Sequence, residues 1–243
     1  VLVCWNDLGT GWLPEDTERD VGGGHALTVK DRHASMHGEI RQRICLLDYP
    51  PGTQLSESVL ADEFGTSRTP MRSVLARLEG EGLVRSVHGV GTIVTDADIM
   101  ELEQAYRLRV ELTALTGRLD PVMPDASFME RLDGLIARAA GMTAYGTPKA
   151  FTKLDMDSFQ TLLELTANEP LRQVLERLYY QTKRLWLVRA IKSELDLCEE
   201  YRIFLHELEA IQIGLQSGDL NAVAQMQRAH ISMSFNRLIQ KKD

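Results

Sequence analysis

The chain has 243 residues, enough for two modest domains, and its 44% hydrophobic and 26% charged residues are typical of a globular protein. It has no apolar run near the roughly 20 residues that span a bilayer, and its three cysteines are scattered. No apolar h-region opens the sequence, so we expect no secretory leader. We therefore expect a cytoplasmic protein without a membrane partner. The formal net charge of −8 argues mildly against nucleic-acid binding, because DNA affinity depends on basic side chains.

The N-terminal part of the chain changes character near residue 31. Residues 1–30 show no hydrophobic period, contain three consecutive glycines and are expected to be a disordered extension. Residues 33–47 then place apolar side chains at helical spacing. This first helix is expected to stop at the Pro-Pro-Gly sequence of residues 50–52.

A second, short helix is predicted over residues 56–65, with Val59, Leu60 and Phe64 facing inward. Gly65 ends it and starts a tight turn into the next helix. Two helices joined by a short glycine-containing turn form a helix-turn-helix.

The third helix has one apolar face and one face of small and basic residues. Met71, Val74, Leu75 and Leu78 fall within about 100° of arc and predict a buried stripe. The residues around the opposite side are Arg68, Thr69, Arg72, Ser73 and Ala76. Short side chains allow close approach to a DNA groove, and arginines bind phosphates or guanine edges. Ser67 is the expected N-cap, and Pro70 lies in the first turn, where its missing N–H costs little.

Two short strands are predicted next, over residues 83–87 and 92–94, separated by a glycine-containing turn at residues 88–91. Three helices followed by a two-stranded hairpin indicate a winged helix over residues 31–95. A polar linker, residues 96–98, follows it.

This segment resembles the DNA-binding domain of the GntR family of bacterial transcription regulators. The residues that carry the resemblance are Pro51-Gly52, Leu55, Leu60-Ala61, Gly65 to Pro70, Arg72, Leu75 to Leu78, Gly82 to Val84, Gly89 and Gly91. Ser58 departs from the pattern, since many relatives have a DNA-contacting arginine there. The DNA-binding residues that the resemblance implies are Ser67, Arg68, Thr69, Arg72 and Ser73 on the third helix, with His88 and Gly89 in the wing reaching the minor groove.

Residues 99–243 show helical periodicity throughout and no convincing strand. We expect an all-α bundle of about six to seven helices. The predicted helices cover residues 99–115, 128–141, 151–165, 171–188, 194–215 and 219–239. The expected fold is therefore mostly α, a winged helix-turn-helix followed by a helical bundle.

The bundle resembles the FCD-type ligand-sensing domain of the FadR-type GntR subfamily. The residues that carry this resemblance are Arg107-x-x-x-Glu111, Asn168 to Leu171, and Gly218-Asp219-x-x-x-Ala222 leading to His230. The resemblance implies a homodimer, formed through the bundle, on a near-palindromic operator. It also implies a ligand-responsive regulator, which we expect to be a repressor.

Many domains of this type hold a divalent metal with an Asp, a His four residues later and two further His 22 residues apart. The matching positions are read as Met156, Gln160, Leu208 and His230, of which only His230 is a ligand. A shift of register to Asp155, Asp157 or His206 would turn those side chains 100° or more away from the site. We therefore expect no metal and no other cofactor.

The expected effector is a small organic acid, with a more apolar ligand as the alternative. The residues predicted to bind it are Arg107, Arg109, Gln160 and His230, with Arg107 favoured over Arg109 to face the pocket on family position. An enzyme is not expected, because the six histidines lie in no nucleophile or metal motif and no phosphate-binding glycine loop is present. A metal-dependent enzyme and a winged helix used for protein contacts are the alternative functions considered.

Overall fold

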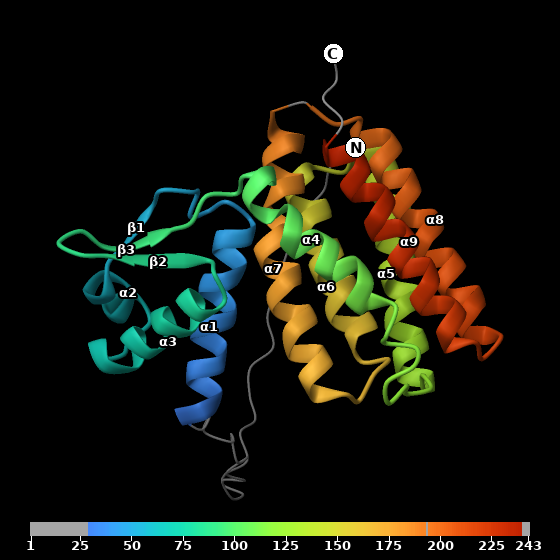
Figure 1. The fold of residues 1–243 in the computed structure, drawn as a ribbon, viewed down its shortest axis with the longest axis horizontal. Helices are drawn as coiled ribbons and strands as arrows, with labels where there is room; N and C mark the ends of the chain where they lie inside the picture. Colours follow the sequence, from blue (N-terminus) through green and yellow to red (C-terminus); the bar gives the residue numbers. More distant parts are fainter. Residues whose placement is uncertain (1–28, 193, 240–243) are drawn as a thin grey trace, which may run out of the picture.

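The computed structural model describes residues 29–192 and 194–239 (Figure 1). The described part of the chain begins with a small unit of three helices and three strands and continues as a larger helical bundle. The mostly α fold predicted from the sequence, a winged helix-turn-helix followed by an all-helical domain, is confirmed.

The first unit is a winged helix. Its elements are α1 (Val29–Cys45), β1 (Gln54–Leu55), α2 (Glu57–Glu63), α3 (Arg68–Gly80), β2 (Val84–Val87) and β3 (Gly91–Val94). The strands form an antiparallel sheet of order β1-β3-β2, in which Leu55 pairs with Thr92 and Arg85 with Ile93. The sequence did not predict β1, which is only two residues long and has no period to detect.

Two details of this unit differ from the sequence prediction. Helix α1 begins at Val29, four residues before the expected start at residue 33, and residues 1–28 lie outside the described part of the chain. Val59, which is predicted to face inward, is 64% exposed, and the buried residues of the seven-residue α2 are Leu60 and Ala61.

The second unit is a bundle of six helices within the described residues, the lower of the two expected numbers. They are α4 (Ile99–Thr113), α5 (Ala126–Tyr145), α6 (Pro148–Leu163), α7 (Glu169–Ile191), α8 (Leu197–Gln216) and α9 (Leu220–Ile239). Most of these helices begin with a capping residue whose side-chain oxygen accepts a hydrogen bond from a free backbone N–H of the first turn. These capping residues are Asp98, Asp125, Thr147, Asn168 and Asp196. Leu108 and Val174, which belong to the apolar periodicity of α4 and α7, are 48% and 41% exposed.

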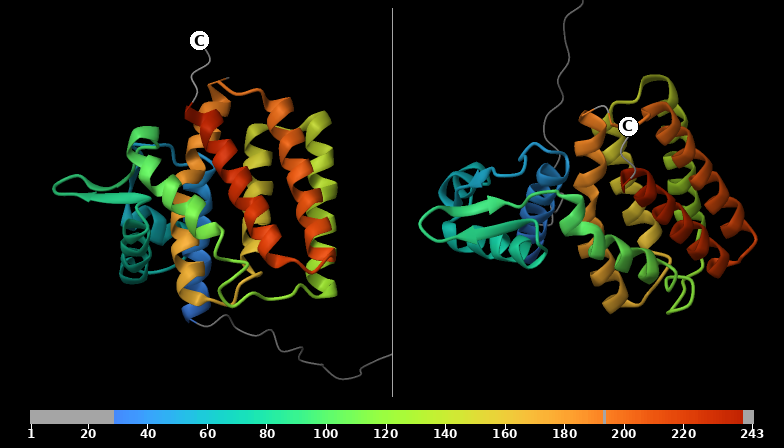
Figure 2. Two further views of the ribbon diagram at one scale, coloured as in Figure 1. Left: turned by 45° about the vertical axis from the view of Figure 1, so that its right-hand side comes forward. Right: turned by 45° about the horizontal axis from the view of Figure 1, so that its top comes forward.

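The two units share a hydrophobic core. Met156, Tyr179 and Tyr180 of the bundle pack in the same cluster as the apolar side chains of the winged helix. Helices α1 and α7 lie side by side at this boundary in both figures (Figures 1 and 2). The winged helix is therefore docked on α7.

The linker between the units is also fixed by α7. The buried guanidinium of Arg184 donates hydrogen bonds to the Thr95 carbonyl at 2.5 Å, to the Thr95 hydroxyl at 2.8 Å and to the Asp96 carbonyl at 3.4 Å. Beside it, the Arg41 guanidinium lies 3.8 Å from the centre of the Tyr180 ring and 3.0 Å from the Glu176 carboxylate. Side chains of α7 therefore contact both the linker and α1 of the winged helix.

None of the helices in residues 29–192 and 194–239 combines the length and the low charge needed to cross a membrane.

Candidate nucleic-acid interface and buried cavity

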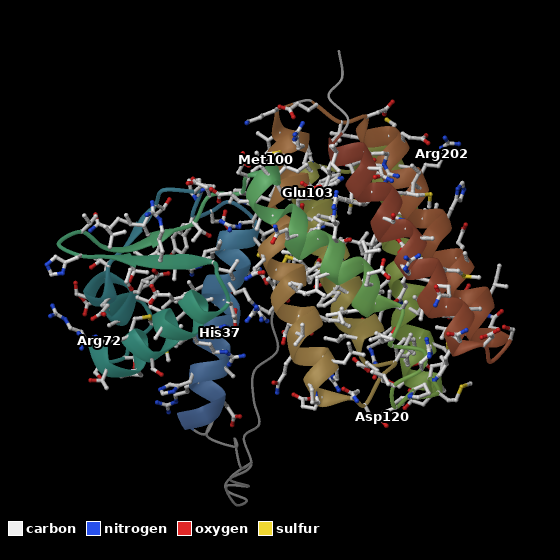
Figure 3. All side chains as sticks on the ribbon, in the orientation of Figure 1. His37, Arg72, Met100, Glu103, Asp120 and Arg202 are labelled. Carbon is white, nitrogen blue, oxygen red and sulfur yellow. The ribbon has the colours of Figure 1, made fainter. Side chains whose placement is uncertain are left out.

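Helix α3 presents the predicted face to solvent. Met71, Val74, Leu75 and Leu78 are buried in the winged-helix core, as their spacing predicts. The predicted contact residues on the other side are all exposed: Ser67, Arg68, Thr69, Arg72 and Ser73. Arg72 projects on the side of the winged helix away from the bundle (Figure 3). This face is free to approach a second molecule.

Ser67 is the N-cap of α3, as predicted, but its side chain makes no capping hydrogen bond. Its hydroxyl is therefore not used to hold the helix. Gly65 before it adopts a φ of 59°, a left-handed conformation that favours glycine and sets the tight turn from α2.

Arg72 is held by a carboxylate that the sequence analysis did not single out. Its Nε lies 3.0 and 3.2 Å from the two carboxylate oxygens of Glu57, and its Nη2 donates to one of them at 2.9 Å. These hydrogen bonds lower the pKa of Glu57 and raise that of Arg72. Since Glu57 lies on α2, fifteen residues away, only the turn geometry brings the two together. The pair fixes the direction of Arg72 before any ligand is bound.

The wing places His88 and Gly89 at an exposed hairpin tip. The Glu79 carboxylate at the end of α3 accepts hydrogen bonds from the Ser86 N–H at 2.6 Å and the Ser86 hydroxyl at 2.9 Å. The wing is thus tied to α3, which keeps the two predicted contact regions in a fixed relation.

The bundle contains a cavity with two adjoining chambers. The larger, of about 70 Å³, lies between α4, α6, α7, α8 and α9 and includes Leu162, Leu163, Leu175 and Leu208 in its wall; we call it the leucine chamber. The smaller, of about 50 Å³, is lined by more polar residues, and we call it the polar chamber. The residues common to both are Arg109, Asp155, Phe204, His230 and Ile231.

The prediction that Arg107, rather than Arg109, faces the pocket is wrong. Arg107 has a 71% exposed side chain that pairs with Glu103 at 2.5 Å and does not line the cavity. Arg109 is 9% exposed and lines both chambers. Side chains two positions apart on a helix point about 200° away from each other around its axis, so only one of the two arginines can face the bundle interior.

The predicted register of α6 is also wrong by one residue. Met156 packs toward the winged helix, and Gln160 is exposed and donates to the Tyr180 hydroxyl at 2.9 Å, so neither lines the cavity. Asp155 and Phe159 take the cavity-facing positions instead. Phe159 is stacked on Tyr179 with ring centres 3.8 Å apart, and this contact orients the helix.

Asp155 is already neutralised by the protein. Its carboxylate lies 2.5 Å from the Lys183 ammonium and accepts a hydrogen bond from the Tyr179 hydroxyl at 2.5 Å. Burial raises the pKa of Asp155. The Lys183 charge, these two hydrogen bonds and the Arg109 charge more than offset that effect, so the pKa lies below its usual value. Burial lowers the pKa of Lys183 and, together with Asp155, raises that of Tyr179.

The donor set does not fit the divalent metal that the resemblance implies. At the four ligand positions in the corrected register stand Asp155, Phe159, Leu208 and His230, and two of these have no donor atom. Asp155 is occupied by Lys183, and His230 Nε2 lies 2.8 Å from the Glu207 carboxylate. Among the described residues, no three His, Cys, Asp or Glu side chains are grouped to hold an ion.

His230 lines the cavity as predicted, and the structure adds Lys183, Glu207 and Gln227, which the sequence analysis did not identify. Gln227 is 8% exposed and its Nε2 has no hydrogen-bond partner. Because Gln227 lies three residues before His230 on one helix, its place on the same face could have been inferred. No comparable pattern indicates Lys183, which is placed by the packing of α7.

Known proteins support the winged-helix assignment. Residues 34–94 match the family of bacterial regulatory proteins, gntR family. A relative named as an HTH-type transcriptional regulator in an unstable DNA locus of Streptomyces ambofaciens is 33% identical over 174 residues, which are 70% of this chain and 64% of the relative. The chain spans 64%, 52% and 65% of the lengths of three curated relatives, each named as an HTH-type transcriptional regulator.

Solved structures share the fold across both units. E. coli McbR/YncC has a TM-score of 0.71 at 15% identity, over 85% of this chain and 96% of that one. A putative transcriptional regulator GntR from Rhodococcus sp. RHA1 has a TM-score of 0.65 at 17% identity, over 86% and 97% of the two chains. These likenesses extend the shared architecture through the helical bundle.

Proposed function

We propose that the whole chain is a cytoplasmic, ligand-responsive transcriptional repressor, because residues 34–94 match the family of bacterial regulatory proteins, gntR family. The observation that carries the proposal is the exposed face of α3. Its small and basic side chains point away from both cores, and its one central arginine is held in place by Glu57. A face of this kind suits the major groove, where an arginine binds guanine with two hydrogen bonds.

The residues proposed to contact DNA are Ser67, Arg68, Thr69, Arg72 and Ser73, with His88 and Gly89 at the minor groove. A single winged helix makes few contacts with DNA, and the chain as a whole is acidic. We therefore propose a homodimer, formed through the bundle, that binds a near-palindromic operator. Two half-sites then add their contacts, and affinity should fall steeply as the salt concentration rises.

The cavity is proposed to bind the effector, a small organic acid, through Arg109 and His230. Tyr179 faces the cavity while the next residue, Tyr180, packs against the winged helix. A ligand that shifts α7 would therefore act on α1 and on the linker held by Arg184. Its influence is limited to the difference between its affinities for the two arrangements.

A duplex selected by the full chain from a random pool provides the test. We expect Arg72→Ala to weaken binding of the selected duplex by about 10- to 100-fold, because it removes a two-pronged base contact. The matched control is Arg202→Ala, which removes an arginine with a 61% exposed side chain, against 71% for Arg72, from α8 on the far side of the bundle (Figure 3). Equal affinities of the two variants would remove the base-contact assignment, and failure of the wild type to retain any duplex at low salt would remove the regulator itself.

A further inference from the structure

Arg109 is a nearly buried cation that has no ion-pair partner of its own among the described residues, although its charge acts at longer range on Asp155. In the described part of the chain, no carboxylate lies within ion-pairing distance of its guanidinium. Its hydrogen-bond partner is the Thr182 hydroxyl at 3.3 Å, and the Tyr179 and Tyr106 rings lie 4.8 and 5.6 Å away. Burying a charge without a counter-ion is costly, so an anion entering the cavity would be stabilised there.

The other charges that line the cavity are paired within the protein. Asp155 is bound to Lys183, Glu207 to His230, and Glu200 to Arg237 at 2.5 Å. Arg109 is thus the one unpaired charge among these described wall residues. A single unpaired cation calls for a single anionic group, and a guanidinium binds a carboxylate with two parallel hydrogen bonds.

A second unsatisfied donor lies in the wall of the leucine chamber. The Gln227 Nε2 is buried without a partner, and leaving such a group unbonded costs about 1–3 kcal/mol. A carboxylate oxygen is a suitable acceptor for this amide. Arg109 and Gln227 together therefore offer donors of the kind that a carboxylate needs.

The rest of the leucine chamber is small, and its hydroxyl groups are used within the protein. Thr113, Thr116 and Ser158 donate to backbone carbonyls, and Tyr179 donates to Asp155. Leu162, Leu163, Leu175 and Leu208 make the remaining wall apolar. Among the described wall residues, no second unpaired cation is present to receive a second carboxylate. A cavity of about 150 Å³ holds benzene, so chambers of about 70 and 50 Å³ admit only a short hydrocarbon portion.

Resting on the proposed function, we infer that the effector is a small monocarboxylate with an apolar portion of roughly three to five carbons, bound without a metal ion. Its carboxylate binds Arg109 and its hydrocarbon portion occupies the leucine chamber. Polycarboxylates are disfavoured because the described cavity wall offers one unpaired cation, and metal-chelated acids because Phe159 and Leu208 stand at the ligand positions.

The test is calorimetric binding to the full chain with isovalerate as the probe, with and without EDTA. We expect isovalerate to bind better than acetate, octanoate, succinate or citrate, and the neutral isostere isovaleramide to bind about 10- to 100-fold more weakly. EDTA should leave the affinity unchanged. Preference for citrate or succinate, loss of binding in EDTA, or no binding of isovalerate at millimolar concentration would each overturn the inference.

Two arginines on α4 give a matched pair of variants. Arg109→Met should lose isovalerate binding by about 10-fold or more, whereas Arg107→Met, which removes the same charge from the outer face, should bind as the wild type does. Gln227→Met provides a second variant, with a several-fold loss, if Arg109→Met does not fold. Equal behaviour of both arginine variants would overturn the inference.

Binding of the selected duplex by the same preparations separates this inference from the proposed function. If the chain retains the duplex but binds no small acid, the inferred effector class is overturned and the proposed DNA binding stands. A chain that binds isovalerate but retains no duplex supports the cavity assignment and overturns the regulator.

Discussion

Arg72 in the winged helix and Arg109 in the bundle are the same side chain in opposite surroundings. Arg72 has a 71% exposed side chain and a carboxylate partner, while Arg109 is 9% exposed and has none. The exposed arginine is fixed in direction at little energetic cost, because water still solvates it. The buried one is a cost that a bound anion would relieve. The recognition face can therefore change without affecting the fold, whereas the cavity cannot.

The largest effect should come from breaking the buried ion pair. Asp155→Asn keeps the shape of the side chain but leaves Lys183, which is 7% exposed, without its counter-ion. We expect a loss of about 3–5 kcal/mol in the free energy of unfolding, measured by urea denaturation. The double variant with Lys183→Met should recover most of it.

An exposed pair supplies the contrast. Arg131 and Glu164 lie 2.5 Å apart with side chains 45% and 49% exposed, and Glu164→Gln should cost at most about 1 kcal/mol. If the two substitutions cost the same, burial would not be the variable that sets how much an ion pair contributes to the stability of this protein.

Acid should abolish the difference between wild type and Asp155→Asn. The pKa of Asp155 is lower in the folded chain than its usual 3.8, so its charge stabilises the fold above pH 3.8. That stabilisation is lost as the pH falls through the folded pKa, which lies below this value. Urea midpoints measured from pH 7 downward should therefore converge, and a constant difference across the acid range would contradict the assignment.

The linker anchor should come next in size. Arg184→Ala removes the hydrogen bonds to the Thr95 and Asp96 carbonyls, and we expect a loss of about 2–3 kcal/mol. Docking of the winged helix should loosen with it. Cys45 reports this, because its buried thiol lies 3.9 Å from the Tyr180 carbonyl and burial raises its pKa to about 11.

Alkylation of Cys45, in a Cys4→Ser background, should be slow in the wild type and about tenfold faster in Arg184→Ala. The exposed Cys198 is the internal reference and should react at the same rate in both proteins. Unchanged protection of Cys45 would mean that α1 stays docked without the anchor.

The two regions also differ in how far the sequence predicts them. The winged-helix face follows from a local pattern, since the stripe from Met71 to Leu78 fixes which side of α3 is exposed. The lining of the cavity depends on which side of each bundle helix faces the centre. Because α6 is shifted by one residue from the predicted register, Asp155 lines the cavity and Met156 packs toward the winged helix. In the register that the structure adopts, Phe159 stacks on Tyr179, twenty residues away, and no local sequence pattern predicts this contact. The ion pairs of Glu57 and Lys183 were missed for the same reason.

The smallest effect on stability should come from Glu57→Gln on the recognition face. The pair with Arg72 is exposed to water, so the unfolding midpoint should stay within error of the wild type. Binding should change in two ways. Loss of a negative charge beside the duplex favours unspecific binding, while loss of the carboxylate that orients Arg72 weakens the selected site.

The ratio of affinities for the selected duplex and a scrambled one should therefore fall several-fold, as measured by competition in gel shifts. Glu63→Gln is a suitable control, because it removes an acidic group that pairs with Arg43 at 2.5 Å rather than with Arg72. An equal fall in both variants would mean that charge alone is responsible. A fall confined to Glu57→Gln would mean that the fixed direction of Arg72 contributes to sequence recognition.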